Sequence, residues 1–217
     1  MKASEAAVRI YDILEADLEQ LTESGRLSVL PSEAVECWGI SQSDVELLRS
    51  YGLPPVRHDG LLGIAGAFQA SAKPSLEGGL FAVGAYGVTK LGLSSADGSV
   101  WTVSRYSPAE IHPQLRALHT HEERTQLVNS TLGNFVEFSW RWYWILPVLA
   151  ERQIAAGDEE VQAWSSARSD AERSLLPDFY ADLRNLCGKI LGRFEVADRQ
   201  VRQAEGAFWR TVVMEYL

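Results

Sequence analysis

The chain has 217 residues, 46% of them hydrophobic and 23% charged, which is typical of a globular protein and excludes disordered and fibrous classes. The net charge of −9 and the pI near 5.0 argue against direct binding of nucleic acid, because neutralising phosphates requires a basic face. An acidic protein is suited to a basic partner, since complementary fields speed encounter. The two cysteines, Cys37 and Cys187, have no metal-site spacing, which predicts free thiols.

A helical pattern opens the chain. Hydrophobic residues recur at intervals of three and four over Ala6–Leu21, which predicts an amphipathic helix with Val8 and Tyr11 on its buried face. The same stretch carries several acids and no apolar segment of the kind that a signal peptide needs, so we expect a cytoplasmic protein.

A second, shorter helix is expected over Ser41–Ser50. Serine can cap its start, and Gly52 and Pro54 interrupt the helical pattern at its end.

The hydrophobic period then changes to that of strands. Asp97-Gly98 lies between two short apolar runs and is a strong hairpin signal, because glycine supplies the positive φ that a tight turn needs. We therefore expect an antiparallel meander built from Leu80–Tyr86, Val88–Ser94 and Val100–Ser104.

The most aromatic segment is NSTLGNFVEFSWRWYWILPVL, residues 129–149. Its apolar residues cover most of a helical circumference, which predicts a buried central helix, capped by Ser130 and with Phe135 on its apolar stripe. Glu137 and Arg141 interrupt it, so the uncharged run is far shorter than the ~20 residues of a membrane span. A helix cannot bury every ring on one face, and we expect Trp140 or Trp144 to point outward.

The remainder of the chain is expected to be helical. Ala155–Ser174 is polar and acidic and is typical of a solvated linker or a peripheral helix. Helical periods resume over Leu175–Leu191 and over Val196–Leu217.

Catalytic signals are weak. His119, His121 and Glu122 are the best metal or acid–base candidates, but no third ligand stands out, and the segment has the composition of a loop. The sequence contains no nucleophile elbow, phosphate-binding loop or zinc-protease motif. We expect no catalytic residues, no metal and no cofactor.

Several short motifs occur in an order that resembles the SUKH superfamily of bacterial immunity proteins, and within it the fourth subgroup. The similarity covers roughly residues 30–155 and a C-terminal Phe-Trp pair, and its motif positions are Gly52, Pro54, Asp97, Gly98, Asn129, Ser130, Phe135 and Trp209. The resemblance implies an α+β fold with a mixed, mostly antiparallel sheet packed with helices. It also implies a non-catalytic protein that binds and neutralises a cognate toxin.

We expect one SUKH-like domain over residues 1–217, with an extra N-terminal helical extension (1–27), a core (28–155) and a helical C-terminal region (156–217). The leading hypothesis is an immunity protein that occludes a cognate protein toxin, with a basic nuclease as one candidate and no nucleic acid or membrane as partner. Candidate partner-binding residues are Trp140, Trp144, Glu137, Asp158, Glu159 and Glu160. Two alternatives stay open, a metal-dependent hydrolase using the His119 segment and a small-ligand module with an aromatic cleft around Trp101 and Trp140.

Overall fold

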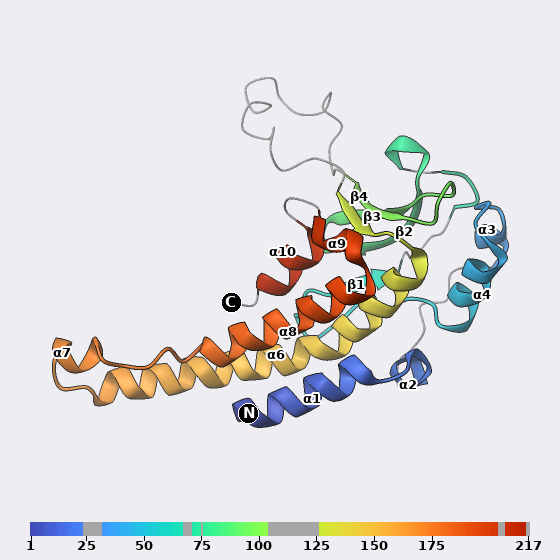
Figure 1. Cartoon of the computed structure of the whole chain (residues 1–217). Coiled ribbons are helices and arrows are strands. Elements are labelled where there is room, and N and C mark those ends of the chain that lie inside the picture. Colours follow the sequence, from blue (N-terminus) through green and yellow to red (C-terminus); the bar gives the residue numbers. More distant parts are fainter. Residues whose placement is uncertain (24–31, 67–70, 75, 104–125, 204–206, 216–217) are drawn as a thin grey trace, which may run out of the picture.

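The computed structural model describes residues 1–23, 32–66, 71–74, 76–103, 126–203 and 207–215, and it has an α+β fold (Figure 1). Its helices are α1 (Ala3–Glu15), α2 (Leu18–Glu23), α3 (Ser32–Glu36), α4 (Gln42–Ser50), the 3-10 turn η1 (Glu77–Gly79), α6 (Leu132–Ser166), α7 (Asp170–Arg173), α8 (Ala181–Ala197), α9 (Arg199–Gln203) and α10 (Phe208–Met214). Its strands are β1 (Ile64–Gly66), β2 (Phe81–Tyr86), β3 (Thr89–Leu93), β4 (Val100–Val103) and β5 (Leu127–Asn129). The fold class expected from the sequence is confirmed.

The five strands form one sheet in sequence order, and each described pair is antiparallel. The predicted meander corresponds to β2, β3 and β4, while β1 and β5 were not predicted as strands. The turn between β3 and β4 is the predicted one. Gly98 has φ +71° there, and the Asp97 carboxylate accepts the backbone N–H of Ser99 at 3.1 Å. The hydrogen bonds that the Asp97 carboxylate accepts, chiefly the one from the Ser99 hydroxyl, lower the pKa of Asp97 below its usual value.

The short helix α4 also follows the sequence. The hydroxyl of Ser41 accepts the backbone N–H of Asp44 at 3.1 Å, which is an N-cap. Gly52 ends the helix with φ +51°, and its N–H donates to the carbonyl of Leu48. The carbonyl of Pro54 then accepts the N–H of Gly66, which joins this segment to β1.

Helix α6 is the long central element. It has 35 residues, so at 1.5 Å per residue it is roughly 50 Å long. Figure 1 shows the sheet near one end of this helix, with α1 and α8 beside its middle, and the other end projecting from the body. The body half of α6 is fully buried at Phe135, Trp142 and Leu146, as the aromatic pattern predicted.

The start of α6 differs from the prediction. Thr131 is the N-cap, because its hydroxyl accepts the N–H of Asn134 at 3.2 Å. Ser130 instead donates its hydroxyl to Asp198, at 2.9 Å, and Asn129 donates its side-chain amide to the same carboxylate. This carboxylate is only 2% exposed, so the β5–α6 connection is fixed by a buried polar network rather than by a simple cap.

Aromatic contacts join three helices beside this network. Phe138 of α6 stacks on Phe194 of α8 with ring centroids 4.1 Å apart, and Trp209 of α10 meets Phe194 edge-on at 5.0 Å. The indole N–H of Trp209 donates to the side-chain oxygen of Asn129 at 3.0 Å. The motif positions Asn129, Phe135 and Trp209 therefore lie in one core.

Two helix predictions need correction. The N-terminal pattern forms two helices rather than one, and α1 buries Ala6, Ile10 and Leu14 while Val8 and Tyr11 are 60% and 65% exposed. The stripe with Ala6 and the stripe with Val8 both have helical spacing. Alanine is smaller than valine, so the Ala6 stripe allows α1 to approach α6 and α8 more closely. The C-terminal pattern also divides, because Ala207 has non-helical dihedrals (φ −44°, ψ 125°) immediately before α10.

Candidate protein-interaction surface

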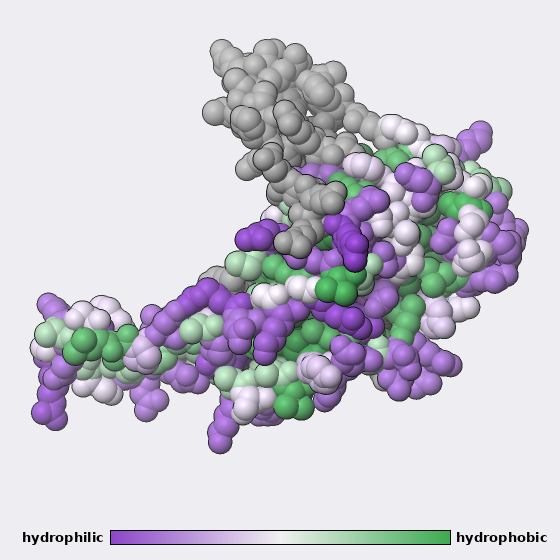
Figure 2. Space-filling model, viewed as in Figure 1, coloured by the Kyte–Doolittle hydropathy of each residue, from purple (hydrophilic) through white to green (hydrophobic). Residues whose placement is uncertain are grey.

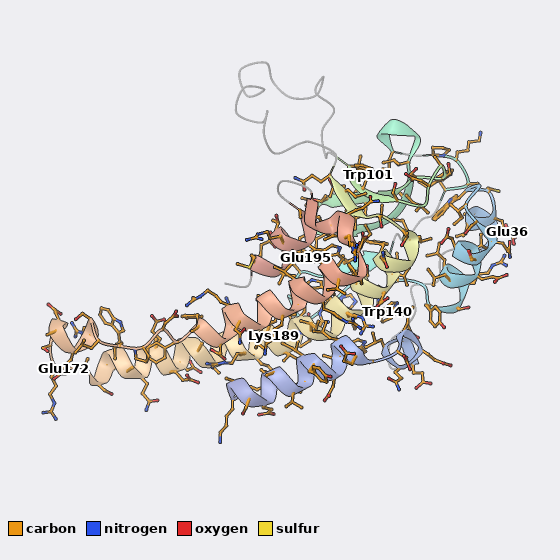
Figure 3. The ribbon with its side chains drawn as sticks, viewed as in Figure 1. Glu36, Trp101, Trp140, Glu172, Lys189 and Glu195 are labelled. Atoms are coloured by element: carbon orange, nitrogen blue, oxygen red, sulfur yellow. The ribbon has the colours of Figure 1, made fainter. Side chains whose placement is uncertain are left out.

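The projecting half of α6, together with α7 and the segment that returns to α8, forms a hairpin-shaped extension. We define the arm as residues 153–180. The polar stretch that the sequence left open as a linker or peripheral helix is thus mostly helical, since α6 continues through Pro147 to Ser166. Figure 3 places Glu172 at the far tip of the arm and Lys189 near the middle of α8.

A buried arginine fixes the base of the arm. The guanidinium of Arg152 is 5% exposed and binds both carboxylate oxygens of Asp182 in α8, at 2.6 and 3.1 Å. It also donates to Glu159, two helical turns further along α6, at 3.0 Å. The bonds from Arg152 lower the pKa of Asp182 below its usual value. Because the guanidinium is planar and forked, this contact fixes an angle as well as a distance.

A second contact closes the hairpin near its base. The hydroxyl of Tyr180 donates to the carboxylate of Glu160 at 3.3 Å, and it lies 3.5 Å from the position that a side chain on Gly157 would take. At that distance a methyl group at position 157 would make an ordinary van der Waals contact with Tyr180, so the returning chain could still pass close to α6.

The outer surface of the arm combines acids with exposed apolar side chains. It carries six Asp and Glu residues against two Arg, a net charge of −4 within 28 residues. Among the ten large hydrophobic residues that are exposed in the described chain, four belong to the arm: Ile154, Val161, Trp164 and Leu175. Figure 2 shows apolar patches between hydrophilic residues along this extension. Exposed apolar groups interspersed with acidic ones on a projecting element are typical of a protein-binding surface.

A hollow near the tip contains the exposed tryptophan. It has a volume of about 510 Å³ and is lined by Glu160, Val161, Trp164, Ser165 and Arg173. The guanidinium carbon of Arg173 lies over the Trp164 ring, 4.9 Å from its centroid. Trp164 was not singled out from the sequence, where it occurs as a lone aromatic residue in a polar stretch.

The arm contains three of the six residues predicted to bind a partner. Asp158 and Glu159 are exposed, and Glu160 is half-buried. Glu159 and Glu160 are already engaged by Arg152 and Tyr180, so they serve the hairpin as well as its surface.

The other three predicted residues lie on the body half of α6. Of the two tryptophans of which one was expected to point outward, Trp140 does not, and Trp144 is only partly exposed. Trp140 is fully buried, and its indole N–H donates to the carbonyls of Tyr51 and Gly52. Trp144 is half-buried and donates to the carbonyl of Leu21 at 2.8 Å. The N-terminal helices, rather than solvent, cover this side of α6.

Glu137 is tied into the same contact between helices. It accepts a hydrogen bond from Arg141, whose side chain is only 8% exposed and donates to the carbonyl of Ile13 at 2.6 Å. Arg141 therefore holds α1 on α6, and its pair with Glu137 belongs to this contact rather than to a fully solvent-exposed surface.

The enzyme alternative gains no support from the described residues. His119, His121 and Glu122 lie outside them, and no group of three or more His, Cys, Asp or Glu residues in the described ranges could hold a metal ion. The proposed aromatic cleft is also wrong, because Trp140 is buried and Figure 3 shows Trp101 on β4 well apart from it.

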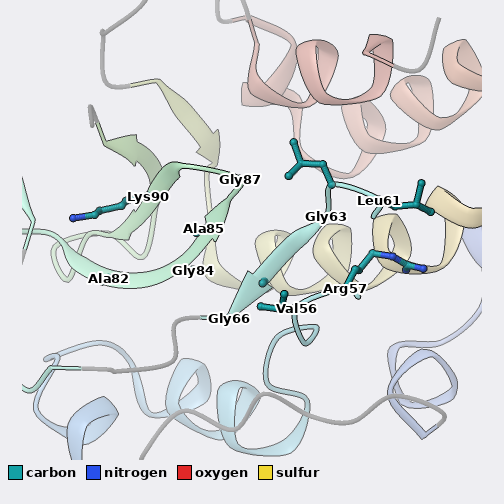
Figure 4. Close-up of a pocket in the computed structure, with 12 residues that line it drawn as sticks. Val56, Arg57, Leu61, Gly63, Gly66, Ala82, Gly84, Ala85, Gly87 and Lys90 are labelled. Atoms are coloured by element: carbon teal, nitrogen blue, oxygen red, sulfur yellow. The ribbon is translucent and has the colours of Figure 1, made fainter. Parts of the chain in front are cut away.

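A separate cleft of about 430 Å³ lies against β1 and β2 (Figure 4). Of the described residues that line it, only Arg57 and Lys90 have polar side chains. Arg57 is committed elsewhere, because it pairs with Asp59 and donates to the carbonyl of Tyr143 at 2.5 Å. Pro147 has no N–H to bond that carbonyl, so Arg57 replaces the missing helical hydrogen bond. Specific ligand sites need several convergent polar groups, and this cleft offers one that is uncommitted.

The fold and the arm define a protein with a compact α+β body and an acidic, partly apolar extension suited to contact another protein. Sequence comparison gives its family, since the model of the SUKH-4 immunity protein family matches residues 13–215, and the chain belongs to that family. This membership supports a role in immunity. Neither a curated protein nor a solved structure matches the chain. Within the described ranges, none of the helices is both long enough and apolar enough to cross a bilayer.

Proposed function

We propose that the protein binds a cognate toxin in the cytoplasm and neutralises it by covering its active face, and that the arm provides the main contact. The family match supports the immunity role, and the observation that favours the arm is its combination of four exposed apolar residues with a net charge of −4. The apolar groups supply the buried centre of an interface, and the carboxylates attract a basic partner. A nuclease with a basic substrate groove is one such partner.

The proposal is tested with the toxin encoded next to this chain, purified as a catalytically inactive variant. We expect a one-to-one complex whose association rate falls steeply as salt is raised, because screening weakens long-range attraction. Leu175 is 83% exposed on the arm, and Asp158 is an exposed acid on the α6 part of the arm. The double variant Leu175→Ala/Asp158→Lys is expected to weaken binding by about tenfold or more, measured by calorimetry.

Val196 provides the matched control, because it is 73% exposed on α8, outside the arm. Val196→Ala should leave the affinity unchanged and the toxin neutralised in co-expression. Equal losses in the control and arm variants, or full protection by the arm variant, would place the contact elsewhere on the molecule. If no complex forms with the neighbouring gene product, the immunity mechanism itself loses its support.

A further inference from the structure

In the hollow at the arm tip, Arg173 lies over the ring of Trp164, and this intramolecular cation–π contact is of a kind that also occurs between proteins. The floor of the hollow comes from residues at successive turns of α6, including Glu160, Val161 and Trp164, and one wall is Arg173 from the end of α7. Trp164 is 52% exposed even with Arg173 above its ring. A cation over an indole face is attracted by the ring quadrupole, and Trp is the best of the aromatic rings for this interaction.

Arg173 is held weakly in this position. Its one described ion pair is with Asp170, three residues earlier in the same short helix, and the Asp170 side chain is 97% exposed. Its Nε is buried and has no acceptor among the described residues. A buried donor without an acceptor is unfavourable, and an exposed ion pair contributes little, so displacing Arg173 from the ring costs the fold little.

We infer that the tip hollow receives a cationic side chain, an arginine or a lysine, from a protein partner, and that Arg173 is the group it displaces. The inference rests on the proposed function, because it specifies which type of side chain on the protein partner binds to the arm. Charge complementarity favours a positively charged ligand at this site, since Glu160 lines the hollow and the arm has a net charge of −4. The indole face and this carboxylate together match a guanidinium, which stacks flat and binds acceptors at its edge.

The test uses the full chain and a defined probe, so that it does not depend on any toxin. The indole N–H signals of the seven tryptophans are followed by NMR during titration with a capped tetra-arginine peptide, at constant ionic strength. A Trp164→Phe variant assigns the signal of interest. We expect a saturable shift of the Trp164 signal, while the half-buried Trp101 and Trp144 act as internal controls that do not respond.

A variant at Arg173 shows whether the peptide displaces this arginine from the Trp164 ring or is only attracted to the acidic surface. Arg173→Ala removes the competing cation and should tighten binding of the peptide by about two- to fivefold, the factor that corresponds to an exposed cation–π contact. A tetra-glutamate peptide should cause no saturable shift. The inference is overturned if Trp164 does not respond, if Trp144 or Trp101 responds equally, or if Arg173→Ala leaves binding unchanged or weaker. A toxin that binds through the arm without any of these responses would leave the proposed function standing and refute the cation site.

Discussion

Arg152 determines whether the arm is a rigid surface or a loose extension. Replacing it with methionine keeps the aliphatic volume but removes both bonds to Asp182 and the bond to Glu159. Removal of one partner from a fully buried ion pair typically costs 3–5 kcal/mol, because the remaining charge is left without compensation. Here the side chains of Asp182 and Glu159 are 29% and 53% exposed, so water solvates them after the change. We therefore expect a loss of about 2 kcal/mol in the free energy of unfolding, near the lower end for hydrogen bonds to charged groups.

The loss is measured by urea denaturation, with hydrogen exchange locating the effect. Exchange should accelerate in the arm and at the start of α8 more than in the sheet, because the lost contacts lie there. Arg184→Met is the matched control, since Arg184 is 47% exposed, pairs with Asp178 on the surface and should contribute about 0.5 kcal/mol or less. Equal effects of the two substitutions, or exchange that accelerates only in the sheet, would refute the role assigned to Arg152.

Three further predictions concern contacts within the body and at the base of the arm. Asp198→Ala should destabilise the protein by about 2–4 kcal/mol in urea denaturation, because three donors from the β5–α6 connection lose a buried acceptor; a loss under 1 kcal/mol would contradict this. Arg57→Ala should cost about 1–3 kcal/mol through the unpaired carbonyl of Tyr143, and this cost should shrink in a Pro147→Ala background, where a restored N–H bonds that carbonyl; an equal cost in both backgrounds would rule the explanation out. Because its guanidinium partner lowers the pKa of Asp182 below 3.8, that carboxylate stabilises the fold above the unfolded-state pKa, and the stabilisation is lost as pH falls through the lower folded-state value. Asp182→Asn should therefore flatten the pH dependence of unfolding free energy below about pH 4, and an unchanged slope would exclude the linkage.

The elements that the sequence predicted correctly are those whose cause is local. Ser41 and Gly52 bound α4 through backbone bonds within a few residues, and Asp97-Gly98 forms its turn in the same way. The aromatic run predicted a buried helix because almost any packing must cover so much apolar surface. By contrast, β1 and β5 have three residues each, too few for a recognisable period, and they exist as strands because β2 and β4 pair with them.

The sequence by itself also determined the acidity of the arm and the motif order that indicates an immunity protein, while it left open whether the arm is helical. It could not determine which faces meet solvent. Trp140 and Trp164 are chemically alike, yet the first is buried because the carbonyls of Tyr51 and Gly52 lie against it, and the second is exposed because α6 continues beyond the body. The tertiary structure decided this difference, since exposure depends on neighbours that are distant in the chain, such as α8, whose Asp182 holds Arg152 and so fixes the direction of the arm.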